Sequence, residues 1–231
     1  MISVEEALMI LEKNVRRLDT EMRPVQLSNG YVLCEAVVSP IDMPSFNQSA
    51  MDGYACHFVA GKDTYNVVGE VAAGSSDNPH LNVGDCVRIF TGAMVPDKAN
   101  TVIQQEWTAV ENNQMRIIHE CGTGRNIRFA GEQIAAGDIA LDAGAVLNPA
   151  AIGFLTSLGI TEIPVYRKPK ISLITTGNEL VKPGKPLKKG QIYESNSAML
   201  VAAINAYGFD NYTVHTVADN YEATRSTIKE A

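Results

Sequence analysis

The segment SFNQSAMDGYACH, residues 45–57, contains one carboxylate, Asp52, and neither lysine nor arginine. Its other side chains are mostly amides, hydroxyls and small groups, so Asp52 has no Lys or Arg partner within the segment. Gly53 follows it, and because Asp-Gly is a strong turn dipeptide, a surface turn is one interpretation. The alternative is a carboxylate that is offered to a ligand.

Two further acids follow segments that are expected to be strands. Glu179, in TTGNEL, comes after the apolar run ISLITTG, and Asp219, in VADN, comes after YTVHTVA. Ligands of an open α/β sheet bind beyond the carboxyl ends of its strands, so the two acids together predict a site. Their carboxylates, with water, suit Mg²⁺ rather than a softer metal. The alternatives are an exposed loop acid at Glu179, and at Asp219 a helix N-cap with Glu222 completing a capping box.

Groups that can hold an anion occur at two places. The segment VKPGKPLKKGQIYESN supplies four lysines that can gather phosphate or oxyanion charge, or can form a solvated surface: Lys182, Lys185, Lys188 and Lys189. In RIFTGAMVP, the sequence Thr91-Gly92-Ala93 follows an expected strand, where a hydroxyl before a glycine can leave backbone N–H groups open to an anion. A plain strand-end turn explains the same residues.

The composition disfavours several other classes of function. The chain has 19 basic and 26 acidic residues, a formal net charge of −7, which argues against a general nucleic-acid surface. Its cysteines form no CxxC pair, and HExxH and Walker motifs are absent, so zinc hydrolysis and P-loop phosphoryl transfer are disfavoured. The four thiols are expected to be buried and reduced: Cys34, Cys56, Cys86 and Cys121.

The chain is expected to be a cytoplasmic protein with more than one core. Its 231 residues exceed the roughly 100–200 residues of a single domain. No apolar run approaches the roughly 20 residues of a membrane helix. The N-terminal segment MISVEEALMILEKNVRRL carries acids where a signal peptide has a basic region, so neither a membrane span nor a secretory signal is predicted.

The elements that position these residues begin with a helix near the N-terminus. Ser3 and Glu6 form a capping box ahead of apolar residues at helical spacing. Residues 31–127 read as a small β module, with short segments between Gly, Asp, Asn and Pro: YVLCEAVVS, YNVVGEVAAG, DCVRIFTGA, TVIQQEW and MRIIHE. In NPAAIGFLTSLGI, Asn148 and the proline after it open a helix that Gly159 ends, and the strand EIPVY follows.

At RKPK, residues 167–170, the pattern changes to that of a parallel α/β unit. ISLITTG, residues 171–177, is a continuous apolar strand of the kind that is buried on both faces. ESNSAMLVAAINAYG reads as a helix ended by Gly208, YTVHTVA as a second strand, and DNYEATRSTIKEA as a helix capped by Asp219 or Asn220. This β-α-β-α order is the start of a parallel, doubly wound sheet with right-handed crossovers.

Six segments, in order, resemble the MoeA/gephyrin E-domain family, the molybdopterin molybdenumtransferases: SAMDGYA, RIFTGAMVP, NIRFAGEQI, SLGI, TTGNEL and GQIYESN. The resemblance covers nearly the whole chain, and AMDGYA with TTGNEL and GQIYESN is a highly specific combination. It implies Mg²⁺-dependent insertion of molybdate into adenylyl-molybdopterin, with release of AMP, in molybdenum cofactor biosynthesis. It also implies a homodimer whose active site is shared between subunits, and a MogA-type adenylyltransferase as upstream partner.

The resemblance implies a multidomain fold of the α+β and α/β classes. Residues 1–45 with 134–168 are expected to form a discontinuous N-terminal domain, and residues 46–133 an inserted β-rich domain. Residues 169–231 are expected to be the start of a MogA-like molybdopterin-binding α/β domain. The family's chains are considerably longer, so this chain is expected to be C-terminally incomplete and inactive in molybdenum insertion by itself.

By position, Asp52, Thr91, Glu179 and Asp219 match catalytic positions of the family, with Glu179 and Asp219 as the metal ligands. The resemblance places the active site between the third domain of one subunit and the β domain of its partner, so Asp52 and Thr91 would close the partner's site. The implied substrate-binding positions are Thr176, Gly177, Asn178, Lys182, Lys185, Gln133, Ser195 and Asn196.

Two residues depart from the family pattern. Gln133 in GEQI and Asn178 in TTGNEL stand where the family often has an acid. Each keeps the shape and one oxygen of the acid and loses its negative charge. These losses, and the part of the third domain that is missing, favour the alternative of a non-enzymatic scaffold or binding module of the same fold, or of an inactive fragment.

Overall fold

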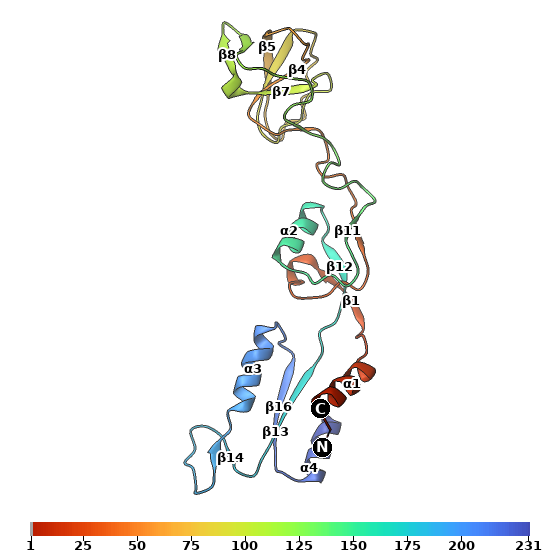
Figure 1. Ribbon diagram of the computed structural model, residues 1–231, viewed down its shortest axis with the longest axis vertical. Helices are drawn as coiled ribbons and strands as arrows, with labels where there is room; N and C mark the ends of the chain where they lie inside the picture. The colour runs from red at the N-terminus through yellow and green to blue at the C-terminus, as the bar shows by residue number, and fades with distance from the viewer. Residues whose placement is uncertain (1) are drawn as a thin grey trace. The chain divides into compact units, whose positions relative to one another are not determined.

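The computed structural model describes residues 2–231 and contains two compact units (Figure 1). One unit comprises the chain up to Ala36 together with Asp142–Ala231, and the other comprises Val37–Leu141. The chain thus leaves the first unit, forms the second and returns. The three-domain division predicted from the sequence, with boundaries near residues 45, 133 and 168, stays a prediction. Within residues 2–231, no helix is both long enough and apolar enough to cross a membrane.

The unit Val37–Leu141 is built on a six-stranded sheet in the order β7-β4-β6-β5-β9-β8. Neighbouring strands are antiparallel except β5 and β6, which are parallel. The strands are β4 (Gly53–Cys56), β5 (Thr64–Val71), β6 (Asp85–Ile89), β7 (Thr101–Gln104), β8 (Thr108–Glu111) and β9 (Gln114–Ile117). A 3₁₀ turn η2 (Gln105–Trp107) follows β7, and two short pairs complete the unit: β2 (Val37–Val38) with β11 (Ile139–Leu141), and β3 (Gln48–Ser49) with β10 (Ile127–Arg128).

This sheet is covered by apolar side chains on both faces. Successive residues of a strand point to opposite faces, and in β4 the buried Ala55 joins one core cluster whereas Cys56 joins another. In β6, Val87 belongs to the cluster of Ala55, and Cys86 belongs to the cluster of Cys56. All four cysteines of the chain are free thiols, and burial raises the pKa of Cys86 to about 12.

The β-rich nature of this region is as predicted, but two details of the prediction are wrong. YVLCEAVVS forms a strand only at Val37–Val38. The main-chain N–H groups before it do not follow one neighbouring strand, because that of Leu33 donates to the carbonyl of Ala145 and that of Cys34 to the carbonyl of Pro164. Strand β4 was not predicted, since its first residue, Gly53, reads as part of an Asp-Gly turn.

The first unit begins with helix α1 (Val4–Asn14), which has the predicted capping box. Ser3 Oγ accepts from the N–H of Glu6 (3.1 Å), and Glu6 Oε2 accepts from the N–H of Ser3 (2.9 Å). Strand β1 (Thr20–Pro24) pairs antiparallel with β12 (Glu162–Tyr166), and η1 (Val25–Leu27) follows β1. Helix α2 (Pro149–Ser157) starts at the predicted cap, where Asn148 Oδ1 accepts from the N–H of Ala151 (2.8 Å).

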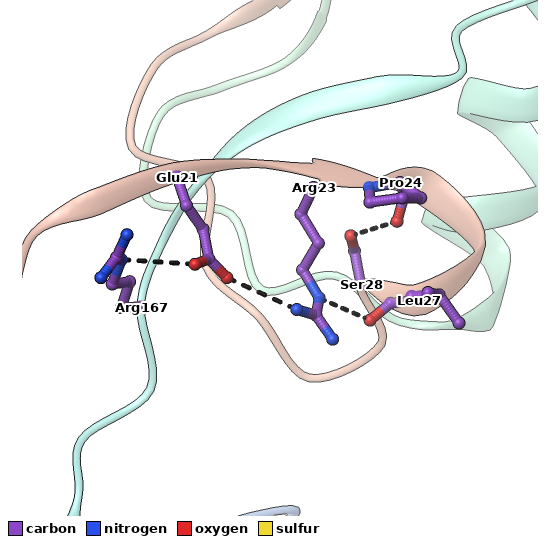
Figure 2. Close-up of polar contacts among 6 residues, drawn as sticks. All are labelled: Glu21, Arg23, Pro24, Leu27, Ser28 and Arg167. Atoms are coloured by element: carbon purple, nitrogen blue, oxygen red, sulfur yellow. Dashed lines mark hydrogen bonds and ion pairs between the residues drawn. The ribbon is translucent and has the colours of Figure 1, made fainter.

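A group of polar contacts joins β1 to the chain around it (Figure 2). Glu21 pairs through its two oxygens with Arg23 (3.4 Å) and with Arg167, the residue after β12 (3.3 Å). Arg23 Nε also donates to the carbonyl of Leu27 (2.8 Å), and its guanidinium lies 4.2 Å from the centroid of the Tyr31 ring. Glu21 and Arg23 are half-buried and Arg167 is exposed, and such partly solvated ion pairs add about 1 kcal/mol or less each.

The C-terminal part of this unit has the predicted β-α-β-α order. Strand β13 (Ile171–Thr176) pairs in parallel with β16 (Tyr212–Val217), and the helices are α3 (Asn196–Ala206) and α4 (Tyr221–Glu230). A short parallel pair lies between β13 and α3, formed by β14 (Leu180–Val181) and β15 (Ile192–Tyr193).

Strand β13 is less buried than its sequence predicts. The expectation of burial on both faces is wrong, because Thr175 is its one buried residue and the sheet within residues 2–231 has two strands, β13 and β16. The segment is attached to the preceding strands by Lys168, whose Nζ donates to the carbonyl of Gly208 (2.6 Å), just beyond α3. The same Nζ lies 4.4 Å from the centroid of the Tyr31 ring.

Candidate functional site

Asp52 and Thr91 are brought together in the sheet of residues 37–141. The main-chain N and the Oγ1 of Thr91 each donate to Asp52 Oδ1, both at 2.8 Å. Asp52 directly precedes β4, and Thr91 lies two residues after β6. These strands are antiparallel with Gly53 opposite Ile89, so the start of β4 lies beside the end of β6. Asp52 therefore has a specific partner far away in the sequence, which a simple surface turn does not require.

Gly53 is needed for the close approach of a neighbouring strand. A Cβ at this position would lie 2.0 Å from the carbonyl oxygen of Ile103 on β7. The main-chain N of Gln105, just after β7, donates to the carbonyl of Asp52 (2.9 Å). The glycine of the Asp-Gly pair thus allows β7 to pack against β4, and this packing fixes the backbone on which Asp52 is carried.

The surroundings of Asp52 favour its ionised form. The backbone and side-chain hydrogen bonds from Thr91 are the main causes that hold the pKa of Asp52 below its ordinary value, and the charge of Arg88 adds a smaller effect in the same direction. The side chain is exposed, so the carboxylate is both charged at neutral pH and accessible to solvent.

The proposal that Thr91-Gly92-Ala93 leaves backbone N–H groups open to an anion is wrong. The N–H of Thr91 donates to Asp52, that of Gly92 to the carbonyl of Ser49 (2.8 Å), and that of Ala93 to the carbonyl of Phe90 (2.9 Å). Gly92 has φ +81°, which a glycine adopts without strain. The segment is the strand-end turn of the alternative interpretation, and its hydroxyl serves Asp52.

The second group of candidate residues lies at the carboxyl ends of β13 and β16. These strands are in parallel register, with Thr176 beside Val217, so the residues that follow them leave the same edge of the sheet. Asn178 Oδ1 accepts from the main-chain N–H of Asp219 (3.2 Å), which joins the two strand ends. Asn178 therefore uses an oxygen that an aspartate would also have at this position.

Glu179 folds back over Gly177. A Cβ on Gly177 would lie 2.9 Å from each carboxylate oxygen of Glu179, so a residue with a side chain would displace this carboxylate. Asn220 caps α4, since its Oδ1 accepts from the N–H of Ala223 (2.8 Å). Asp219 is thus not the N-cap, and its side chain is exposed beside a surface hollow of about 460 Å³ that runs along α4.

The donor set at this edge fits a magnesium ion that is completed by other ligands. Within residues 2–231, no group of three or more His, Cys, Asp or Glu side chains is placed to hold a metal. Mg²⁺ is commonly bound by one or two carboxylates together with waters and substrate phosphates. Two exposed acids, Glu179 and Asp219, match that mode, whereas a structural metal enclosed by protein does not fit here.

The loop after β14 carries the predicted lysines on an exposed surface. The Lys182 and Lys185 side chains are exposed, and the carbonyl of Lys185 accepts from the hydroxyl of Tyr193 (3.0 Å), which ties the loop to β15. Ser195 and Asn196 are also exposed, at the start of α3.

Gln133 lies with Asp52 and Thr91 in the unit Val37–Leu141, apart in sequence from the strand-end group. Its side chain is exposed, and its main-chain N donates to the carbonyl of Met43 (3.0 Å). The structure thus joins Asp52 to Thr91 and Asn178 to Asp219 by hydrogen bonds, and Glu179 directly follows Asn178. Gln133 shares with Asp52 and Thr91 only the unit Val37–Leu141.

Three residues near these groups were not singled out from the sequence. Arg88 and Gln105 contact the segment around Asp52, and Glu194 accepts from the N–H of Ser197 (2.8 Å) and from its hydroxyl, at the start of α3. These bonds lower the pKa of Glu194. The sequence signal for Arg88 is its position as a lone cation between apolar residues in DCVRIF.

Two family models match the chain. The model described as the MoeA N-terminal region (domain I and II) matches residues 2–159, and the model described as a probable molybdopterin binding domain matches residues 172–231. The first match contains Asp52 and Thr91, and the second contains Glu179 and Asp219.

Relatives and solved structures agree with these matches. The chain is 36% identical over 230 residues to molybdopterin molybdenumtransferase 2 of Mycobacterium tuberculosis, covering 95% of this chain and 56% of the relative. It is 35% identical over 245 residues to the molybdopterin molybdenumtransferase of a Nostoc species, covering 100% of this chain and 56% of that relative. The crystal structure of the molybdopterin biosynthesis MoeA protein from Pyrococcus horikoshii OT3 has a TM-score of 0.89 at 31% identity, covering 100% of this chain and 64% of that one. The chain spans a little over half the length of the curated relatives it matches.

Proposed function

Because this chain belongs to the MoeA family, we propose that it acts in molybdenum cofactor biosynthesis and carries site residues of a molybdopterin molybdenumtransferase. The reaction is the insertion of molybdate into adenylyl-molybdopterin with release of AMP. The observation that carries the proposal is the hydrogen bond from the main-chain N of Asp219, a family-matched residue, to Asn178, which joins the carboxyl ends of β13 and β16. Ligands of open α/β sheets bind at such an edge.

At this edge, Glu179 and Asp219 are the residues that would hold Mg²⁺, which when bound would supply positive charge to the phosphate and molybdate oxygens. The turn Thr176–Asn178 would lie against the adenylyl phosphate, and Gly177 leaves the space beside this turn to the Glu179 carboxylate. Lys182 and Lys185 add positive charge near the anionic substrates, and the exposed Ser195 and Asn196 offer polar groups to them.

Asp52 and Thr91 would complete the site of a second subunit. Thr91 holds Oδ1 of Asp52, so Oδ2 can accept a hydrogen bond from water or from a protonated oxyanion oxygen. A homodimer is supported by α1, in which no residue is buried and whose Val4, Leu8 and Leu11 are more than half exposed. A MogA-type adenylyltransferase would supply the adenylyl-molybdopterin.

A second candidate function is a non-enzymatic binding or scaffold module of the same fold. It is favoured by Gln133 and Asn178, each of which lacks the charge of the acid that the family often has. Against it, Asn178 still makes the bond to the N–H of Asp219 that an aspartate oxygen would make, so the local geometry does not require the charge.

Molybdate-dependent release of AMP from adenylyl-molybdopterin distinguishes the two functions. The assay should use this 231-residue chain and any longer product of its gene, because the chain spans part of its relatives. We expect activity in the longer product, loss of it in Glu179→Gln, and retention in Glu222→Gln, a change of an exposed acid on α4 of the same segment. Absence of AMP release in a folded longer product that binds the substrate would favour the scaffold function.

A further inference from the structure

Arg88 joins the strand that leads to Thr91 with the segment that contains Asp52. It lies on β6 directly opposite Tyr54 of β4. Its Nη1 donates to the carbonyl of Gly53 (3.2 Å), and its Nη2 donates to Oε1 of Gln105 (2.7 Å). The guanidinium group therefore spans β4 and the turn that follows β7.

Two aromatic rings flank the guanidinium. Its central carbon lies 5.3 Å from the centroid of the Tyr54 ring and 5.0 Å from that of the Phe90 ring. Arginine combines such ring contacts with a planar, rigid set of donors, which a lysine cannot reproduce. Arg88 is thus held in one orientation by contacts on several sides.

Gln105 extends this connection to Asp52. Its main-chain N donates to the carbonyl of Asp52 (2.9 Å), while its side chain accepts from Arg88. The carbonyls of Asp52 and Gly53 are therefore both held, one by Gln105 and the other by Arg88 itself. A rotation of the peptide between these residues would break one or both bonds and would move the Asp52 carboxylate away from Thr91.

We propose that Arg88 is a positioning residue, which acts through Gly53 and Gln105 to hold the Asp52 carboxylate against Thr91. Arg88 touches no reacting atom in this role. The inference rests on the proposed function only because it treats Asp52 as a site residue. Its test measures the structure around Asp52 and does not require catalytic activity. The charge of Arg88 also helps to lower the pKa of Asp52, which gives a second readout of the same contact.

The test uses nuclear magnetic resonance on the folded 231-residue chain and on Arg88→Met, which keeps an apolar stem and loses the donors. We expect the Thr91 amide to exchange about three- to tenfold faster relative to amides inside β6, as loss of the net stabilisation of one hydrogen bond implies. We also expect the pKa of the Asp52 carboxyl to rise. The matched control is Arg116→Met, which changes an exposed arginine on β9 of the same sheet and should alter neither readout.

Two further variants keep the test decisive. Arg88→Lys retains the charge and loses the planar fork, so faster exchange of the Thr91 amide is expected even there. If Arg88→Met fails to fold, Gln105→Ala removes an exposed acceptor and should shift the Thr91 amide in the same direction. A lower melting temperature with unchanged Thr91 exchange and unchanged Asp52 pKa would show that Arg88 only stabilises the fold. If Arg88→Met lost AMP release while Thr91 exchange and the Asp52 pKa stayed unchanged, Arg88 would act in the reaction by some other route, and the positioning role would be wrong.

Discussion

Thr91 donates two hydrogen bonds to one oxygen of Asp52, with its main-chain N and its Oγ1 each 2.8 Å from Oδ1. The two residues are 39 positions apart, so the pair depends on the alignment of β4 with β6. Among the contacts of residues 2–231, Oδ2 of Asp52 accepts no hydrogen bond and is open to a ligand. An active site shared between subunits would require such a carboxylate from this sheet, one that is charged, held in one orientation and left with a free oxygen.

Replacement of Asp52 by asparagine should abolish turnover with little effect on stability. Asn keeps an oxygen that can accept from Thr91 and tolerates the same backbone conformation, while the charge is lost. Activity per folded molecule and the melting temperature should be measured in the longest active product of the gene. A variant that melts early and yet keeps full activity per folded molecule would support a purely structural turn.

The Asp52–Thr91 pair predicts a dependence of stability on pH. Because the folded-state pKa of Asp52 is lowered, its contribution is fully present above the ordinary value of 3.8 and is lost as the pH falls through the lower folded value. Thr91→Val removes the hydroxyl donor, so its stability deficit relative to wild type should be constant near neutrality and shrink below pH 3.8. In an Asp52→Asn background the deficit should not depend on pH; a deficit that grows in acid would contradict this assignment.

Gly53→Ala should destabilise the protein by about 2 kcal/mol or more, the scale of overpacking at a position that cannot relax. The added methyl would meet the main chain of Ile103 at 2.0 Å, and backbone cannot move aside as a flexible side chain can. Gly69→Ala on β5 is the matched control, since its Cβ would meet only Val87 at 4.0 Å. Chemical unfolding should show little change or a small gain for the control; equal losses in both variants would argue against the close approach at Gly53.

The strand β13 should be less protected from hydrogen exchange than β6. Three of the five residues of β6 are buried and strands flank it on both sides, whereas β13 has one buried residue and pairs with β16 alone within residues 2–231. Amides of residues 171–177 should exchange faster than those of 85–91, and limited proteolysis should cut first beyond Lys168. Equal protection of the two strands would show that the C-terminal segment has stability that its burial does not account for.

The elements with local signals could be predicted from the sequence. Ser3 with Glu6, and Asn148 with the proline after it, mark their helices within a few residues, and the apolar runs around Ile171 and Tyr212 indicate parallel strands. The same patterns placed Glu179 and Asp219 at one edge of a sheet. Such features need only the residues close by in the chain.

The features that depend on long-range pairing could not be predicted. The contact of Asp52 with Thr91 and the role of Arg88 follow from the register Gly53–Ile89 and Tyr54–Arg88, which no local pattern specifies. The Asp-Gly pair indicates a turn at Gly53, whereas the real constraint on this glycine, the main chain of Ile103, comes from another strand. The anion-binding hypothesis at Thr91-Gly92-Ala93 failed for the same reason, since the partners of these N–H groups include Asp52 and Ser49.

Mixed dimers of two inactive variants test the central claim most directly, namely that Asp52 of one subunit and Glu179 of the other serve one site. Asp52→Asn and Glu179→Gln should each be inactive in molybdate-dependent AMP release from adenylyl-molybdopterin. When they are co-expressed, about half of the dimers are mixed and each has one of its two sites intact, so about a quarter of wild-type activity should return. If the mixed dimers form and activity stays at the level of the single variants, the two groups of residues do not share a site across subunits.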